Sequence, residues 1–261
     1  MLWWLFVLAF AFGNVLLHKR GNETAGKLIG IMGMTTYLWS ARLLAVIGVL
    51  VVSSLLGRNL LRSSTRLKTF LIFVPIAVIL DLSLISVPIE RIHYVQYGFL
   101  TWLGYKAMGK QLPAAMMAFV VAVLDEAYQY WILYAKERFV YFDWNDIVLN
   151  LIGALIVLLF FLPIEERAGK MPAKSVLAAV ILWTLTSALF VFVLNPDHYL
   201  VRDDPYKGTG SFWITSNINT NYHVMNTLEG LVFLGVILIL TIGYHLPSHS
   251  PGWRNWQTHR T

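Results

Sequence analysis

Long apolar segments separated by short charged ones dominate the pattern of this chain. Each segment approaches the roughly 20 residues that a helix needs to cross a hydrocarbon core. The residues do not alternate between apolar and polar, as those of a membrane β-barrel do. The pattern therefore predicts an all-α, polytopic transmembrane helical bundle of about eight spans (seven to eight), at residues 2–18, 36–57, 69–87, 91–108, 113–134, 145–162, 174–194 and 226–246.

The composition favours a membrane protein over a soluble one. Hydrophobic residues make up 57% of the chain and charged residues 13%, whereas roughly a quarter of the residues of a soluble domain are charged. The absence of cysteine excludes disulfide frameworks and thiolate metal sites. No basic stripe accompanies the net charge of +6, so we expect the lipid bilayer and no nucleic acid as a partner.

The N-terminal region is the hardest to divide into spans. The first apolar segment has neither a basic leader nor a small-residue cleavage site, so we interpret 2–18 as a retained helix. Residues 28–35 are also apolar, but 28–57 is too long for one simple span. We interpret 28–35 as a re-entrant or interfacial segment or as an extension of a tilted helix.

The loops indicate the orientation. Those on one side of the predicted membrane hold eleven Lys and Arg residues and those on the other side hold eight. This bias favours a multi-pass topology with both termini in the cytoplasm. The polar and aromatic segment 195–225 would then be a long extracytoplasmic loop. Residues 247–261 differ abruptly in composition, and we expect a disordered tail.

Seven ionisable residues within the predicted spans fall in the same half of the membrane: Arg42, Asp81, His93, Asp125, Glu126, Asp146 and Glu229. Such residues are costly in hydrocarbon and usually mark a function or a compensating ion pair. With both termini in the cytoplasm, this half is the outer leaflet. Three consecutive spans offer polar groups at one depth, with His93 to Tyr97, Glu126 and Asn150, which predicts a polar cavity in the outer-leaflet half, open to the outer surface.

Helical spacing places several polar side chains on shared faces. Glu90, His93 and Tyr97 follow one face of the span at 91–108. In the next span, Gln129 lies one turn from both Asp125 and Glu126.

A third polar stripe lies in the span at 145–162. Asp143, Asp146, Asn150 and Gly153 share one helix face. Gly153 on that stripe would let a neighbouring helix approach closely.

Several of these residues occur in an order that is typical of one family. They are Glu90-Arg91-Ile92-His93-Tyr94, Tyr97-Gly98, Asp125-Glu126 with Gln129, Phe142-Asp143-Trp144, Asp146, and Asn150 with Gly153. On these residues, the stretch from about Val87 to Leu158 resembles the VanZ-like family of bacterial integral membrane proteins. Two positions depart from the family pattern: Gln96 stands where some members have an acid, and Arg138 only loosely matches a usual arginine.

The resemblance implies a cell-envelope role in the bacterial cytoplasmic (inner) membrane. Members of the family are linked to resistance against the glycopeptide antibiotic teicoplanin, by a mechanism that is not established. The chain then divides into N-terminal spans at 1–86, a VanZ-like core at 87–162, further spans with the long loop at 163–246, and the tail at 247–261.

Several polar residues also have structural explanations. Asp143 can cap the helix that follows it, and Asp146 stands three residues later, as in a capping box. Asp125 or Glu126 can form an ion pair with an arginine, and Arg42 with Asp81 can be a purely structural pair. His93 can be an interfacial histidine with satisfied hydrogen bonds.

Three functions are compatible with the pattern. The first is an enzyme acting on a lipid-linked or envelope substrate, such as a lipid-linked envelope precursor, at the outer leaflet, with His93, Glu126 and Asp146 as catalytic residues. A divalent metal held by these three is a variant of this hypothesis. The alternatives are non-catalytic binding of a lipid headgroup or glycopeptide and, less favoured, a proton-coupled transporter. Substrate-binding residues would be Glu90, Tyr97, Asp125, Gln129, Arg138, Asp143 and Asn150.

Overall fold

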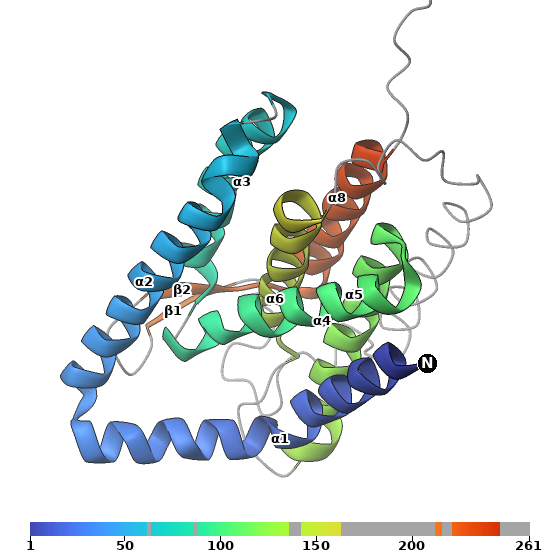
Figure 1. Cartoon of the computed structure of the whole chain (residues 1–261). Helices are drawn as coiled ribbons and strands as arrows, with labels where there is room; N and C mark the ends of the chain where they lie inside the picture. Colours follow the sequence, from blue (N-terminus) through green and yellow to red (C-terminus); the bar gives the residue numbers. More distant parts are fainter. Residues whose placement is uncertain (62–63, 86–87, 136–141, 163–211, 216–220, 246–261) are drawn as a thin grey trace, which may run out of the picture.

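The computed structural model of the chain is mostly helical (Figure 1). It describes residues 1–61, 64–85, 88–135, 142–162, 212–215 and 221–245. The α-helices in these ranges are α1 (Leu2–Met32), α2 (Met34–Leu61), α3 (Ser64–Leu84), α4 (Ile92–Met108), α5 (Gln111–Tyr128), α6 (Trp144–Ile156) and α8 (Thr227–His245). The expected span at 174–194 and the tail at 247–261 lie outside the described residues.

Helix α1 is longer than the sequence pattern predicts. It continues through the polar residues that follow the first apolar segment and ends at Met32. The prediction that the first helix ends near residue 18 was therefore wrong, and residues 28–32 form the end of α1 and do not extend the second predicted span. Polar side chains do not interrupt a helix if they are exposed, whereas Gly33 has φ 78° and ends it. Figure 1 shows the sharp turn from α1 into α2 at this point.

The core of the molecule is formed by α4, α5 and α6, with α1 packed against α4. α5 continues as a π-helical turn over Gln129–Leu133, and α6 continues as another over Val157–Phe161. The rings of Phe10 and Phe99 join α1 to α4, with centroids 5.0 Å apart. Burial of apolar surface stabilises this unit, through side chains that include Tyr97, Leu100, Phe119, Ala122, Leu149 and Leu158.

Glycine allows α4 and α6 to approach each other at their crossing. A Cβ added to Gly153 would lie 2.5 Å from the backbone oxygen of Tyr94. A Cβ on Gly98 would in turn lie 3.1 Å from the backbone oxygen of Gly153. The expectation that Gly153 permits close helix packing is confirmed.

Replacing Gly153 by alanine is expected to lower the free energy of unfolding by about 2 kcal/mol, because the methyl group overlaps backbone atoms that cannot rotate away. Thermal or denaturant unfolding in detergent measures this effect. Gly13→Ala is the matched control, since a Cβ there meets no described atom within 4 Å. Equal stability of the two variants would contradict the packing described above.

A short antiparallel β-hairpin lies where the sequence predicts a loop. Strands β1 (Phe212–Thr215) and β2 (Asn221–Val224) pair within the expected extracytoplasmic segment 195–225. No expectation of strand structure was made there. β2 leads directly into α8, which stands beside α6 (Figure 1).

Asn145, at the start of α6, connects three parts of the fold. Its Nδ2 donates to the backbone oxygens of Leu84 at 3.1 Å and His223 at 2.6 Å. Its Oδ1 accepts from the backbone nitrogen of Met225 at 3.1 Å. One buried amide therefore holds the end of α3, the hairpin and the start of α8 together.

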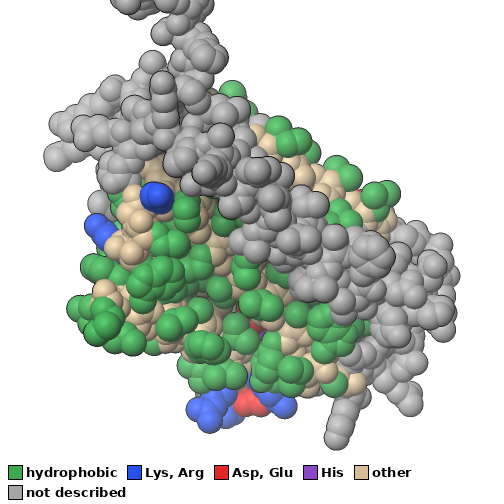
Figure 2. All heavy atoms as spheres, turned by 90° about the vertical axis from the view of Figure 1, so that its right-hand side faces the viewer, with side chains coloured by type: hydrophobic (Ala, Val, Ile, Leu, Met, Phe, Trp, Pro, Cys, Tyr) green, Lys and Arg blue, Asp and Glu red, His purple; other side chains and the backbone are tan. Residues whose placement is uncertain are grey.

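Among the described residues, four helical segments are long and apolar enough to cross a membrane: Leu2–Met32, Leu67–Leu84, Gln111–Leu133 and Trp144–Phe161. Large hydrophobic side chains are exposed along α1 and α3, including Phe6, Phe12, Leu71 and Ile79. Figure 2 shows a face covered mainly by hydrophobic side chains, with charged ones gathered near its edges. Such a surface is typical of a protein that contacts lipid.

Candidate functional site

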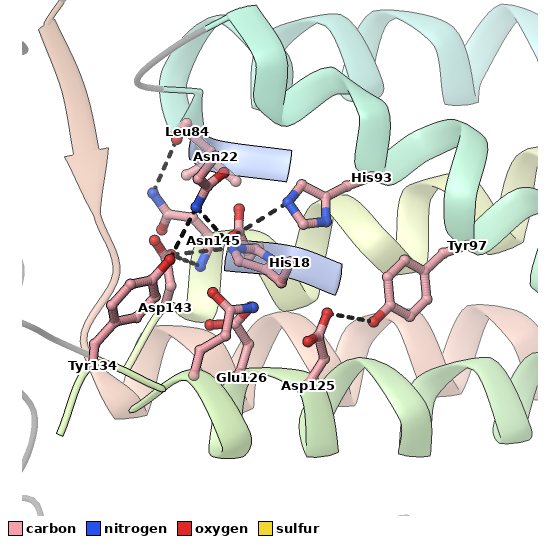
Figure 3. Close-up of polar contacts among 12 residues, drawn as sticks. His18, Asn22, Leu84, His93, Tyr97, Asp125, Glu126, Tyr134, Asp143 and Asn145 are labelled. Atoms are coloured by element: carbon pink, nitrogen blue, oxygen red, sulfur yellow. Dashed lines mark hydrogen bonds and ion pairs between the residues drawn. The ribbon is translucent and has the colours of Figure 1, made fainter. Parts of the chain in front are cut away.

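The polar residues of the predicted site converge between α4, α5 and α6 (Figure 3). The packing of these three helices on one another brings them together although they lie far apart in the sequence. They are almost completely buried, with exposed fractions of 0% for Tyr97, Asp125 and Asn150, 3% for Glu126, 5% for His93 and 8% for Gln129. We call Asp125, Glu126 and Asp146 the acidic cluster.

His93 and Asp146 form the central pair of the site. The Nε2 atom of His93 lies 3.4 Å from Oδ2 of Asp146. Both side chains are largely shielded from solvent, with 6% and 13% of their surface exposed. A carboxylate in this position orients the imidazole and favours the tautomer that carries its proton on Nε2. The other ring nitrogen, Nδ1, is then free to accept a proton.

Two further hydrogen bonds hold the acids of α5 in place. The hydroxyl of Tyr97 donates to Oδ2 of Asp125 at 3.2 Å, which links α4 to α5. Gln129 donates through Nε2 to Oε1 of Glu126 at 3.1 Å. Gln129 begins the π-helical turn, a local distortion that is frequent at functional sites.

Asp143 caps α6. Its Oδ1 accepts hydrogen bonds from the backbone nitrogens of Asn145 at 2.9 Å and Asp146 at 3.3 Å. The structural explanation of Asp143 is therefore confirmed. The charge of Asp143 also acts on Glu126, so this residue lies at the border of the site.

Glu90 and Arg138 differ in how far the structure describes them. Glu90 lies in the short 3-10 helix Pro88–Arg91 before α4, and its charge acts on His93. Arg138 lies outside the described residues, so its predicted role in binding stays a prediction.

Asp81 has a different partner from the one expected. The Arg91 side chain donates to both carboxylate oxygens of Asp81, and the closest contact is 2.7 Å. The hydroxyl of Tyr94 donates to Oδ1 of the same group at 3.1 Å. Arg42 instead lies over the ring of Trp39, 5.1 Å from its centroid. The predicted Arg42–Asp81 pair was wrong, because Arg91 is the arginine that binds the Asp81 carboxylate.

Helix α1 contributes residues that the sequence analysis missed. The ring of His18 lies 6.5 Å from that of His93, measured between centroids. Asn22 contacts Nε2 of His18 at 3.1 Å and donates to the hydroxyl of Tyr134 at 3.0 Å. The only available signal was a polar stretch after an apolar helix, which also resembles an ordinary loop. The close-up in Figure 3 shows both α1 residues beside the core cluster.

Several buried atoms of the site have no hydrogen-bond partner among the described residues. They are Nδ1 of His93, Oδ1 of Asp125, and both Nδ2 and Oδ1 of Asn150. Asn150 lies beside His93, yet neither of its polar atoms makes a well-formed hydrogen bond. Buried polar groups are nearly always paired, so these atoms are available to a polar ligand or to water.

The predicted metal variant gains no support from the geometry. Within the described ranges, no three histidine, aspartate or glutamate side chains are grouped so that they could hold a metal ion. His93 and Asp146 are close to each other, but they and Glu126 do not form a ligand set. Hydrogen bonding and acid–base chemistry are what this arrangement supports.

Comparison with protein-family models, curated proteins and solved structures finds no match for this chain.

Proposed function

We propose that the protein is an acid–base enzyme of the bacterial cytoplasmic membrane that acts on the polar headgroup of a lipid-linked envelope substrate. The observation that carries this proposal is the buried pair between His93 and Asp146, which leaves Nδ1 of His93 without a partner among the described residues. A buried, oriented imidazole with one free nitrogen is suited to accept a proton from a substrate.

The neighbouring groups supply the other roles of such a site. Glu126 is the candidate general acid, since it lies in the same buried cluster and interacts electrostatically with Asp146. Tyr97 holds Asp125, and Gln129 holds Glu126, so both acids are fixed before a substrate arrives. Such preorganisation lowers the cost of reaching the transition state. Asp146 orients His93 in this scheme.

The cellular setting of the proposal comes from the sequence and the apolar helices. The four apolar segments support insertion into a membrane, and the distribution of loop charges favours cytoplasmic termini. The resemblance of residues 87–158 to the VanZ-like family supports a cell-envelope role connected with teicoplanin resistance. The outer-leaflet position of the site and the seven to eight spans are parts of this proposal.

Binding without chemistry is the second candidate. It is favoured by the unpartnered amide of Asn150, which has no evident role in proton transfer but is suited to hold a headgroup. An enzyme changes many substrate molecules per copy, whereas a binding protein protects only about one. The stoichiometry of protection in cells therefore distinguishes the two.

Replacing Glu126 by glutamine is expected to abolish teicoplanin resistance in a bacterial host that expresses the protein. Glutamine preserves the size of the side chain and can still accept the hydrogen bond from Gln129, but it cannot donate or accept a proton in catalysis. The measurement is the minimal inhibitory concentration at equal abundance of the protein in the membrane.

The matched control is Glu23→Gln, on the exposed part of α1. This variant is expected to retain the resistance of the unmodified protein. Full resistance with Glu126→Gln at normal abundance would rule out the assigned catalytic role of Glu126. If resistance requires about one protein copy for each antibiotic or lipid molecule, binding without chemistry is favoured instead.

A further inference from the structure

We propose that the acidic cluster receives a primary ammonium group, carried by the headgroup of the substrate. The inference rests on the proposed function in that it assigns the ligand to the same site. Three independent features of the described residues support it: the sign of the buried charge, the kind of hydrogen-bonding atom left unpartnered, and the charges on α1 beside the site.

The buried charge favours a cation. Asp125, Glu126 and Asp146 come from two helices, and the structure shows mutual electrostatic interaction among them. When more than one of these carboxyl groups is ionised, the carboxylates repel one another, and the repulsion is strong where water is scarce. An anionic group such as a phosphate would add to this repulsion, whereas a positively charged group would relieve it.

The unpartnered atoms favour a hydrogen-bond donor. Among the unpartnered atoms of the site in the described part of the chain, three are acceptors, namely Oδ1 of Asp125, Nδ1 of His93 and Oδ1 of Asn150, and one is a donor, Nδ2 of Asn150. A primary ammonium carries three N–H donors and a positive charge on one small atom. Figure 3 shows the side chain of His93 from α4 and those of Asp125 and Glu126 from α5 on the facing sides of the two helices.

A metal ion fits this space less well. A divalent ion needs several oxygen or nitrogen ligands at about 2 to 2.5 Å from one point. No group of three suitable side chains meets this condition among the described residues. Hydrogen bonds from an ammonium tolerate the wider spacing of these acceptors.

The charges on α1 indicate that the ammonium belongs to a phospholipid headgroup. The ring of His18 lies 6.5 Å from that of His93 between centroids, and Lys19 and Arg20 follow it on other, exposed faces of α1. A phosphate joined to the ammonium by a short linker would leave the buried cluster toward this exposed basic stretch, where lysine and arginine side chains bind phosphate. In a zwitterionic headgroup such as phosphoethanolamine, the ammonium would therefore lie in the acidic cluster and the phosphate at the basic surface of α1.

The test is binding of short-chain phosphatidylethanolamine to the purified full-length protein in detergent, followed through the unfolding temperature. Phosphatidylcholine, which lacks N–H donors, and phosphatidylglycerol, which lacks the amine, are the matched lipids. Only phosphatidylethanolamine is expected to raise the unfolding temperature. Equal effects of the three lipids would overturn the proposal. Free ethanolamine binding as tightly as the lipid would overturn the lipid source of the ammonium.

Two variants link the effect to the site. Asp125→Asn keeps the shape of the side chain and is expected to weaken binding of phosphatidylethanolamine at least tenfold. Asn150→Leu is expected to raise the unfolding temperature of the free protein, because it removes unpartnered buried atoms, and to abolish the response to the lipid. If both variants bind like the unmodified protein, or if Mg²⁺ binds to the site in place of the amine, the proposal fails.

This experiment is separate from the test of function. It uses purified protein and measures binding, whereas the resistance test uses cells and measures the effect of Glu126→Gln. If the purified protein does not prefer the amine lipid, but Glu126→Gln still abolishes resistance in cells, only the ligand class is refuted. Amine-selective binding together with full resistance of Glu126→Gln would refute only the catalytic role.

Discussion

Replacing His93 by glutamine is expected to lower turnover by at least about 100-fold, the usual size of a general acid–base contribution. The variant keeps a polar side chain next to Asp146, but an amide cannot accept a proton as Nδ1 of His93 does. In a host that expresses the protein, resistance should fall to the level of cells without it. The protein should still insert and accumulate, which immunodetection in membrane fractions measures.

Asp146→Asn is expected to cause a similar loss, since an asparagine no longer fixes the tautomer of His93. Because the two residues act as a unit, the double variant should be little worse than either single one. His223→Gln is the matched control: this histidine pairs with Glu229 at the start of α8, outside the acidic cluster, and its replacement should leave resistance intact. Additive losses from His93→Gln and Asp146→Asn would show that the pair does not function as proposed.

Replacing Asn145 by leucine is expected to lower the free energy of unfolding by about 3 kcal/mol. The substitution leaves the backbone oxygens of Leu84 and His223 and the backbone nitrogen of Met225 without their partner. Each buried group that loses its hydrogen bond costs about 1 to 3 kcal/mol. The hairpin and the end of α3 should loosen from α6 together, which unfolding and hydrogen exchange of the purified protein would detect.

Asn22→Leu is the matched control for this stability effect. Asn22 also makes two side-chain contacts, to His18 and Tyr134, but it is exposed, so water can replace its partners. Its replacement should cost less than about 1 kcal/mol. If Asn145→Leu is no more destabilising than Asn22→Leu, the buried amide does not hold these segments together.

The positions of the core helices could be read from the sequence. The expected spans at 91–108, 113–134 and 145–162 correspond closely to α4, to α5 with its π-helical turn, and to α6 with its π-helical turn. Length and continuous hydrophobicity suffice for this, because they decide which segments can leave water. The end of α1 could not be found in this way, since exposed polar residues are compatible with both a helix and a loop.

The composition of the site was also largely determined by the sequence. Helical spacing placed Asp125, Glu126 and Gln129 on neighbouring faces, and the Gln129–Glu126 hydrogen bond agrees with it. Asp143 could be identified as a cap because capping depends only on the next few residues. These are local relations, for which the regular geometry of one helix is sufficient.

Which residues from different helices meet was decided only by the tertiary structure. The Asp81–Arg91 pair, the approach of His18 to His93 and the three contacts of Asn145 depend on the angle and depth at which helices pack. That packing depends on small details such as the absence of a side chain at Gly153. The sequence alone thus indicated a helical membrane protein with a polar site that contains a histidine and several acids. Tertiary packing decided that His93 pairs with Asp146 and that α1 contributes to the site, because neither relation is encoded within a single helix.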